Sequence, residues 1–147
     1  VRHDSVQDTQ LYVIRSGDSG NKDYTGLLFN SGQNSFEGYI LDDSVESNYS
    51  AHIYSDTSPQ VDKWYHVVFT KDWNGSNSFL KMYVNGSLES EKTDTYKLNG
   101  QSDSTSELRI GLNGYESAPM NGSISDARIY NRVLTPQEVS YLYEQKY

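Results

Sequence analysis

Short apolar segments separated by turn residues dominate this chain of 147 residues. Most of these segments are rich in β-branched and aromatic residues, and no helical period precedes Thr135. Regularly spaced segments of strand length are typical of an all-β sandwich or barrel. We expect strands over residues 10–16, 25–30, 36–42, 49–55, 64–71, 79–84 and 107–111.

The pair Asn85-Gly86 gives the strongest local signal in the chain. Both central positions of a type I′ turn need a positive φ, and Asn-Gly supplies it at the lowest cost. Alternation in the preceding segment places Leu80, Met82 and Val84 on one face of a strand. The sequence therefore predicts a hairpin from residue 79 to about residue 92.

A short helix is expected near the C-terminus. Thr135 can cap it, Pro136 suits its first position, and Glu138 can complete a capping box. Spacing along one helical face predicts an apolar side formed by Val139, Leu142 and Tyr143. Just before this helix we expect a further strand over residues 126–130, with Ala127 and Ile129 on one of its sides.

Length and charge set limits on the organisation and the partners of the chain. A chain of 147 residues without a linker-like tract predicts one domain, covering residues 1–147. A formal charge of −8 without a basic stripe argues against nucleic acid as a partner. No apolar run approaches the roughly 20 residues that span a bilayer, so membrane insertion is not expected.

Composition favours an extracellular or cell-surface location. The chain has thirteen Tyr, few Lys and many Asn, Ser, Thr and Gly residues. It has no Cys, so cysteine usage does not indicate its redox compartment. Four N-x-S sequons would matter in a secreted protein, although such sequons also arise by chance in an Asn/Ser-rich chain. They begin at Asn48, Asn74, Asn85 and Asn121.

Four motifs in the last part of the chain carry a family resemblance. In order, they are WYHVVFTKD, FLKMYVNGSL, ELRIGLNG and NGSISDARIYNRVLTPQE. This order resembles the laminin-G-like or pentraxin-like branch of the concanavalin A-like lectin/glucanase superfamily. The resemblance implies an all-β jelly-roll β-sandwich of two antiparallel sheets with one short C-terminal helix, and it implies a core position for Trp64.

The sequence departs from that family at two places. Ser125 stands where the family often has Asp. Family members also usually open with a strand that has no counterpart in residues 1–9, VRHDSVQDT. We therefore expect the single domain to lack its first strand, which is cleaved, lies outside this sequence, or is supplied by another chain.

Three classes of function occur in the resembled superfamily: sugar binding, protein binding and glycan cleavage. Cleavage needs two carboxylates flanking one bond, which the related glucanases place in a pattern similar to Glu-x-Asp-x-x-Glu. The nearest run, Glu89, Glu91 and Asp94, lacks that pattern and follows a hairpin turn. We therefore expect no enzymatic activity and no catalytic residues.

Aromatic residues in loops give the candidate ligand site. Sugar rings pack their C–H patches on aromatic faces, while their hydroxyls need amide or carboxylate partners. Each candidate ring could instead anchor a loop or lie half-buried at a sheet rim. The predicted ligand-binding residues are Trp73, Asn74, Asn113, Tyr115, Glu116 and Tyr49.

Acidic loop residues suggest a structural Ca²⁺ site. Oxygen ligands such as Asp suit Ca²⁺, and the resemblance implies such a site at the sandwich edge. The predicted metal ligands are Asp18, Asp23 and Asp126, although acidic loops are also often only hydrated. No two of the three His have a zinc-like spacing, so we expect no His-based metal site.

Together these features predict a non-catalytic extracellular carbohydrate-binding module whose partner is a glycan or polysaccharide. The main alternative is a structural or adhesive domain of a larger surface assembly, completed by a strand from elsewhere and bound to other surface-protein subunits. The third alternative is a polysaccharide-cleaving enzyme of the same superfamily.

Overall fold

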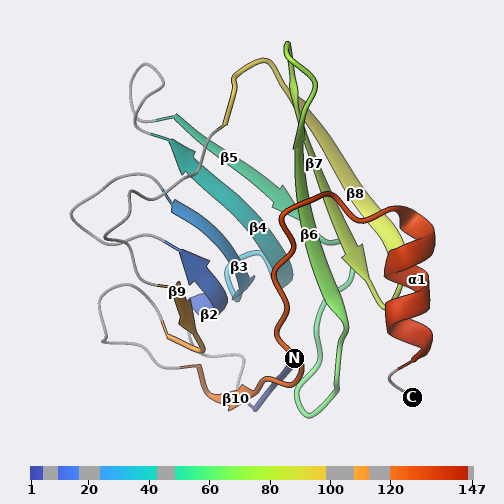
Figure 1. Cartoon of the computed structure of the whole chain (residues 1–147). Helices are drawn as coiled ribbons and strands as arrows, with labels where there is room; N and C mark the ends of the chain where they lie inside the picture. The colour runs from blue at the N-terminus through green and yellow to red at the C-terminus, as the bar shows by residue number, and fades with distance from the viewer. Residues whose placement is uncertain (5–9, 17–23, 43–48, 99–107, 113–119, 146–147) are drawn as a thin grey trace.

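A computed structural model describes residues 1–4, 10–16, 24–42, 49–98, 108–112 and 120–145. Two antiparallel sheets face each other across the core (Figure 1). The five-stranded sheet has the order β5 (Tyr49–Tyr54), β4 (Ser35–Asp42), β3 (Tyr24–Asn30), β2 (Gln10–Ser16) and β9 (Leu108–Ile110). The three-stranded sheet has the order β6 (Val67–Trp73), β7 (Ser78–Val84) and β8 (Ser87–Asp94).

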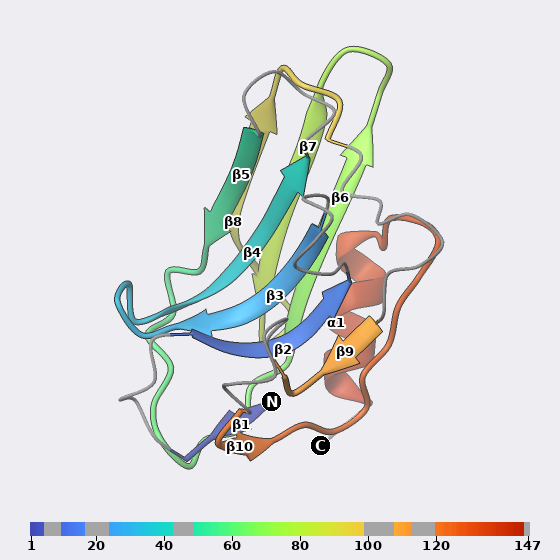
Figure 2. The same cartoon turned by 90° about the vertical axis from the view of Figure 1, so that its left-hand side faces the viewer.

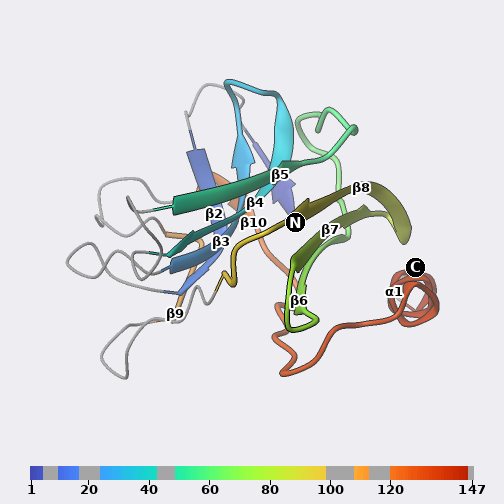
Figure 3. The same cartoon turned by 90° about the horizontal axis from the view of Figure 1, so that it is seen from above.

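Two smaller elements complete the described fold. A two-stranded ribbon pairs β1 (Arg2–His3) with β10 (Gly122–Ser123) at one end of the five-stranded sheet (Figure 2). The helix α1 (Pro136–Glu144) lies on the outside of the three-stranded sheet (Figure 3). The predicted class, an all-β sandwich of two antiparallel sheets with one short C-terminal helix, is confirmed. No helix among the described residues is long and apolar enough to cross a membrane.

The core lies between β4 and β5 on one side and β7 on the other. Leu80, Met82 and Val84 are at most 2% exposed, which confirms the face predicted for them. They pack with Phe36 and Ile40 of β4 in one cluster. Full burial of each such side chain contributes about 1.5–3 kcal/mol to folding.

The hairpin predicted around Asn85-Gly86 is confirmed. Asn85 has φ 50° and Gly86 has φ 82°, the left-handed conformation that a type I′ turn requires. The turn joins β7 to β8, so the hairpin extends from Ser78 to Asp94.

The C-terminal helix forms with the predicted capping box. The Thr135 hydroxyl accepts from the Glu138 N–H, and the Glu138 carboxylate accepts from the Thr135 N–H at 2.8 Å. Val139 is fully buried and packs with Tyr83 and Leu134, which fastens α1 to the outer side of the three-stranded sheet.

The start of β6 differs from the prediction. The strand begins at Val67 and includes Trp73, which the sequence placed in a loop. The core position expected for Trp64 is wrong, since 43% of this residue is exposed. Tyr65 occupies the interior in its place, and alternation turns the neighbouring Trp64 away from the core.

The strand predicted over residues 126–130 does not form. This stretch has no strand pairing in the described part of the chain, and Asp126, with φ 56°, breaks its extension. Ile129 is 64% exposed and Tyr130 is 40% exposed. Residues 124–134 instead run outside the described strands, beside β6 and across the opening between the two sheets (Figure 1).

Candidate functional site

The outer face of the five-stranded sheet can be identified from one glycine. A Cβ atom on Gly38 would lie 2.5 Å from the Phe69 ring of β6, so Gly38 faces the opposing sheet. Its neighbours in β4, Glu37 and Tyr39, therefore point to the outer face. In β5, Tyr54 lies opposite Glu37 and His52 lies opposite Tyr39, which places all four side chains on that outer face.

Three of these side chains form a row of near-parallel rings. The Tyr39 and His52 rings have centroids 5.6 Å apart and an interplanar angle of 15°. The His52 and Tyr54 rings follow at 6.3 Å and 11°. Tyr39 is buried, while 37% of Tyr54 and 40% of the His52 side chain remain exposed. The row thus passes from the protein interior to an accessible surface.

The Tyr39 ring occupies the space over a second glycine. A Cβ atom on Gly26, its cross-strand partner in β3, would lie 2.5 Å from Tyr39 Cε1. Any larger residue at this position would push the Tyr39 ring away from the sheet. Gly26 therefore allows the Tyr39 ring to lie close against β3.

A buried carboxylate orients the row. Glu37 is only 2% exposed, and its Oε2 accepts a hydrogen bond of 2.6 Å from Asn30 Nδ2 of β3. Its Oε1 contacts His52 Nδ1, and a further hydrogen bond joins it to the Tyr54 side chain. Polar groups from the two neighbouring strands, β3 and β5, therefore bind the carboxylate of Glu37 in β4.

Burial alone would raise the pKa of Glu37, because it penalises the charged form. The hydrogen bonds from His52 and Asn30 outweigh that penalty and hold the pKa of Glu37 below its ordinary value. Burial and the nearby Glu37 carboxylate both raise the pKa of Tyr54. At neutral pH the cluster thus contains an ionised carboxylate and a protonated phenol.

The accessible edge of this cluster offers ring faces together with polar groups. His52 Nε2 lies 3.2 Å from Ser50 Oγ, so a hydroxyl and an imidazole nitrogen border the exposed rings. Such a mixture of apolar faces and oriented polar edges suits a ligand that has both C–H patches and hydroxyls.

Trp73 and Asn74 lie at the turn between β6 and β7. Trp73 is half-buried, and its backbone N–H donates to Asp72 Oδ1 at 2.8 Å. Asn74 Oδ1 accepts from the N–H groups of Ser76 and Asn77, both at 2.9 Å. The amide oxygen of Asn74 therefore already stabilises the turn.

Tyr49 connects the two sheets. Its hydroxyl donates to Asp94 Oδ2 at 2.6 Å, and its ring lies 4.5 Å from that of Tyr96, centroid to centroid. The hydrogen bond to Asp94, assisted by burial, raises the pKa of Tyr49 to about 12. The structure thus engages this hydroxyl in a contact between β5 and β8.

The other predicted site residues divide into two groups. Asp126 accepts from its neighbour Arg128 at 2.7 Å and 2.9 Å, an exposed bidentate ion pair. The part of the chain that the structure describes holds no cluster of three or more His, Cys, Asp or Glu suited to a metal. The remaining predicted residues lie outside the described residues: Asn113, Tyr115 and Glu116 for the ligand, and Asp18 and Asp23 for the metal.

The cluster on the outer face was not predicted from the sequence. Alternation within β4 and β5 carries part of the signal, since it separates Glu37 from Phe36 and places His52 and Tyr54 on a common face. The missing information is the register between strands, which sets Glu37 opposite Tyr54. No local motif in the sequence encodes that register.

The match to one protein family agrees with this architecture. A family model described as the Concanavalin A-like lectin/glucanases superfamily matches residues 1–140. No curated protein matches the chain. Among solved structures, the chain is similar to an S-layer domain-containing protein (residues 221–444) from Clostridium thermocellum ATCC 27405, with 24% identity and a TM-score of 0.47. The match covers 97% of this chain but only 66% of that one.

The family match includes every described strand and the first part of α1, residues 136–140. The protein therefore belongs to the concanavalin A-like lectin/glucanase superfamily, as a laminin G-like domain.

Proposed function

We propose that this protein is a non-catalytic, extracellular or surface-displayed carbohydrate-binding module. We further propose that its glycan site is the outer-face cluster, defined as Asn30, Glu37, Tyr39, His52 and Tyr54. The observation that carries the proposal is the row of stacked rings held over one buried carboxylate. Membership of a superfamily that includes lectins agrees with it.

The exposed rings would form the apolar part of the site. A pyranose presents axial C–H groups that pack on an aromatic face, and Tyr54 and His52 offer such faces at the accessible end of the row. Because both rings are held by Glu37, little conformational entropy would be lost when a sugar packs on them.

The polar edge of the cluster would select among sugars. The Ser50 hydroxyl and His52 Nε2 lie beside the rings and can exchange their mutual contact for hydrogen bonds to sugar hydroxyls. Glu37 would act as a positioning residue, because it is almost fully buried and its oxygens are engaged by protein groups. A single buried carboxylate in this role favours binding over hydrolysis.

Trp73 and Asn74 give a second place for glycan contact, and the sequence also predicts Asn113, Tyr115 and Glu116 as ligand-binding residues. The half-burial of Trp73 and the use of Asn74 within its own turn make this surface less suited to binding than the outer-face cluster.

A pair of matched variants separates the two surfaces. We expect Tyr54→Ala to weaken glycan binding at least about tenfold, equivalent to about 1.4 kcal/mol, because it removes the exposed tyrosine ring at the accessible end of the row. Tyr54→Phe, which keeps the ring, should retain most of the affinity, and Trp73→Ala should bind as the wild type does. Glycan arrays followed by affinity electrophoresis measure these differences, with circular dichroism as the check on folding.

Two results would contradict the proposed site. Loss of binding in Trp73→Ala but not in Tyr54→Ala would move the site to the turn between β6 and β7. Absence of binding to every glycan, with Ca²⁺ present, would favour the second function, a structural or adhesive domain that contacts other subunits of a surface assembly.

A further inference from the structure

Glu37 orients the protons of the polar groups around it. The low pKa of Glu37 keeps its carboxylate ionised at neutral pH. An ionised carboxylate only accepts hydrogen bonds, so each group that bonds to it must donate. Its contact with His52 Nδ1 therefore assigns a proton to that ring nitrogen. The Tyr54 hydroxyl, which also bonds to Glu37, likewise turns its proton toward the carboxylate.

The other ring nitrogen of His52 is consequently an acceptor. A neutral imidazole carries one proton, so with Nδ1 protonated the free lone pair lies on Nε2. Nε2 lies 3.2 Å from Ser50 Oγ, and the Ser50 hydroxyl therefore donates to it. Because 40% of the His52 side chain is exposed, a sugar hydroxyl can take the place of Ser50. That sugar hydroxyl must then donate its own proton to Nε2.

The remaining groups around His52 leave this assignment to Glu37. The titratable side chains that face the imidazole are Glu37 and Tyr39 from β4 and Tyr54 from β5. The group that β3 contributes to the cluster, Asn30, is uncharged and bonds to the other oxygen of Glu37. Among the described residues, Glu37 is thus the charged group in contact with His52.

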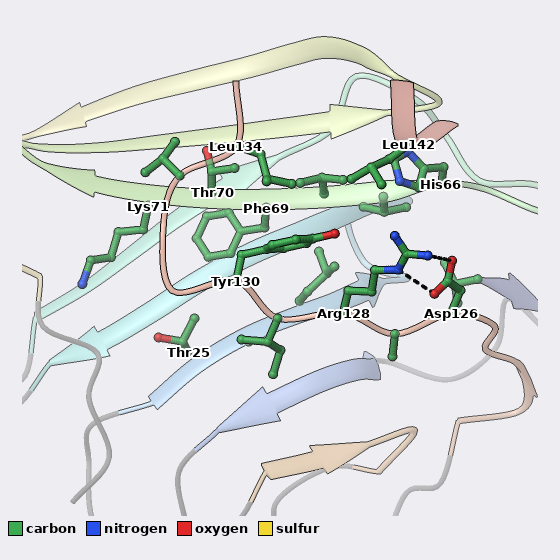
Figure 4. Close-up of a pocket in the computed structure, with 18 of the residues that line it drawn as sticks. Thr25, His66, Phe69, Thr70, Lys71, Asp126, Arg128, Tyr130, Leu134 and Leu142 are labelled. Carbon is green, nitrogen blue, oxygen red and sulfur yellow. Dashed lines mark hydrogen bonds and ion pairs between the residues drawn. The ribbon is translucent and has the colours of Figure 1, made fainter. Parts of the chain in front are cut away.

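Two cationic side chains of the sandwich lie away from Glu37. Lys71 and Arg128 line a cavity of about 920 Å³ between β6, part of β3 and residues 124–134. Figure 4 shows both side chains there, with Arg128 bonded to Asp126. Neither is among the groups that shift the pKa of Glu37. These two cations therefore do not offset the negative charge beneath the row of rings.

We propose that His52 Nε2 selects the ligand of the outer-face cluster as a hydrogen-bond acceptor, so that the site takes an uncharged sugar with a donating hydroxyl and rejects an anionic sugar. Such selection rests on the proposed function. A carboxylate or sulfate on a sugar has no proton to donate and would meet the lone pair of Nε2. The ionised Glu37 and the formal charge of −8 also oppose an anion. Glu37 is the positioning residue, because it fixes the tautomer of His52 while it is itself buried.

Protonation of His52 should remove this preference. Histidine is the side chain that ordinarily changes charge between about pH 5 and pH 8. An imidazolium donates from both nitrogens, so a sugar hydroxyl beside Nε2 would then have to accept. The added positive charge would also favour an anionic sugar.

The first experiment uses the protein without a ligand. Long-range ¹H–¹⁵N correlation spectra distinguish protonated from unprotonated ring nitrogens, and for His52 we expect a proton on Nδ1 and none on Nε2 at about pH 7.5. Glu37→Gln should shift the proton toward Nε2, because Asn30 can keep the amide oxygen and leave the amide NH₂ facing Nδ1. His66, beside the other sheet, should not change. A proton on Nε2 of the wild type, or an unchanged tautomer in Glu37→Gln, would overturn the proposal.

The second experiment uses the methyl glycosides of glucose, galactose and mannose, their monodeoxyfluoro derivatives and the matching methyl uronosides. NMR titration at the His52 amide gives the dissociation constants. At about pH 7.5 we expect replacement of one hydroxyl by fluorine to weaken binding about fivefold or more. The uronoside should bind at least about tenfold more weakly than its neutral counterpart. Both differences should shrink at about pH 5.5.

The variant His52→Phe keeps a ring in the row but has no Nε2, so it should lose both the fluorine effect and the pH dependence. The wild-type spectra and titrations decide the proposal even if this variant does not fold. Uronosides that bind as tightly as the neutral sugars, or no loss with fluorine at any position, would overturn the selection and leave the glycan site in place. Absence of binding by every glycoside would overturn the proposed function, and the selection with it.

Discussion

Glu37 is a carboxylate on the outer face of a sheet, where solvent ordinarily reaches such groups, yet only 2% of it is exposed. Its burial is tolerated because Asn30 and His52 supply hydrogen bonds from two neighbouring strands. Removal of one partner from such a buried group leaves the others unsatisfied, at a cost of about 1–3 kcal/mol. The side chain thus couples the stability of the sheet to the geometry of the proposed glycan site.

The lowered pKa of Glu37 predicts a specific pH dependence. A carboxyl whose pKa is depressed by folding stabilises the protein above its unfolded pKa of about 4.3, and this stabilisation is lost as the pH falls through the folded pKa. Glu37→Gln should therefore be less stable than the wild type by about 1–3 kcal/mol at pH 7, and the difference should shrink below about pH 4.

Urea unfolding of both proteins between pH 7 and pH 3 measures this difference. Because all other carboxyls are common to the two proteins, their contributions cancel to first order. A difference in unfolding free energy that stays constant over this range would show that ionised Glu37 does not stabilise the sheet.

At the scale of elements, two strands from different sheets approach closely at Gly38. A Cβ atom there would lie 2.5 Å and 2.7 Å from two carbons of the Phe69 ring. Gly38→Ala should destabilise the protein by about 1–3 kcal/mol through overpacking, more than the gain of about 0.4–1 kcal/mol from a less flexible unfolded chain. The unfolding free energy from denaturant titration tests this.

Gly32→Ala provides the matched control, because Gly32 lies in an exposed turn where the added Cβ would meet only Asn30 Oδ1, at 3.3 Å. We expect a change within about 0.5 kcal/mol. Equal effects of the two substitutions would mean that the contact between Gly38 and Phe69 does not hold the sheets at their present separation.

The elements themselves were largely predictable. Alternation and turn residues determined most strands, and the Asn85-Gly86 turn and the capping box of α1 are local motifs with a single favourable geometry. Pairing between strands that are distant in the sequence is not encoded in a local motif of this kind. The strand expected around Ile129 failed because it has no partner among the described residues, and the Glu37 cluster was missed because its members come from three strands.

At the scale of the whole molecule, the two sheets pack together along β4 and β7, and Phe69 of β6 joins this contact, while a cavity lies between β6, part of β3 and residues 124–134. The sandwich is therefore tightly packed along β4 and β7 and has a cavity beside β6. The outer-face cluster belongs to the five-stranded sheet alone, so its geometry depends on the β3, β4 and β5 ladder rather than on the filling of the cavity.

We propose that Asp18 and Asp23 are ligands of a structural Ca²⁺ ion, as the sequence predicts. If Asp18 and Asp23 bind it, Ca²⁺ should raise the unfolding midpoint by about 2–4 °C for each kcal/mol of binding energy. The double variant Asp18→Asn, Asp23→Asn should lose this response. Asp126→Asn should keep it, because Asp126 is engaged by Arg128.

Differential scanning fluorimetry with Ca²⁺, and with Mg²⁺ as the control ion, measures this response. A wild-type midpoint that does not change with millimolar Ca²⁺ would contradict the calcium proposal. Loss of the response in Asp126→Asn would instead place the ion beside residues 124–134.

An NMR titration of the ¹⁵N-labelled protein with the best ligand from the glycan array tests most directly whether the outer-face cluster is the glycan site. We expect saturable shifts of the backbone amides in the outer-face cluster, strongest at His52 and Tyr54, with little change at Trp73 and Asn74. Saturable shifts confined to the turn between β6 and β7, or no binding by any glycan, would contradict it.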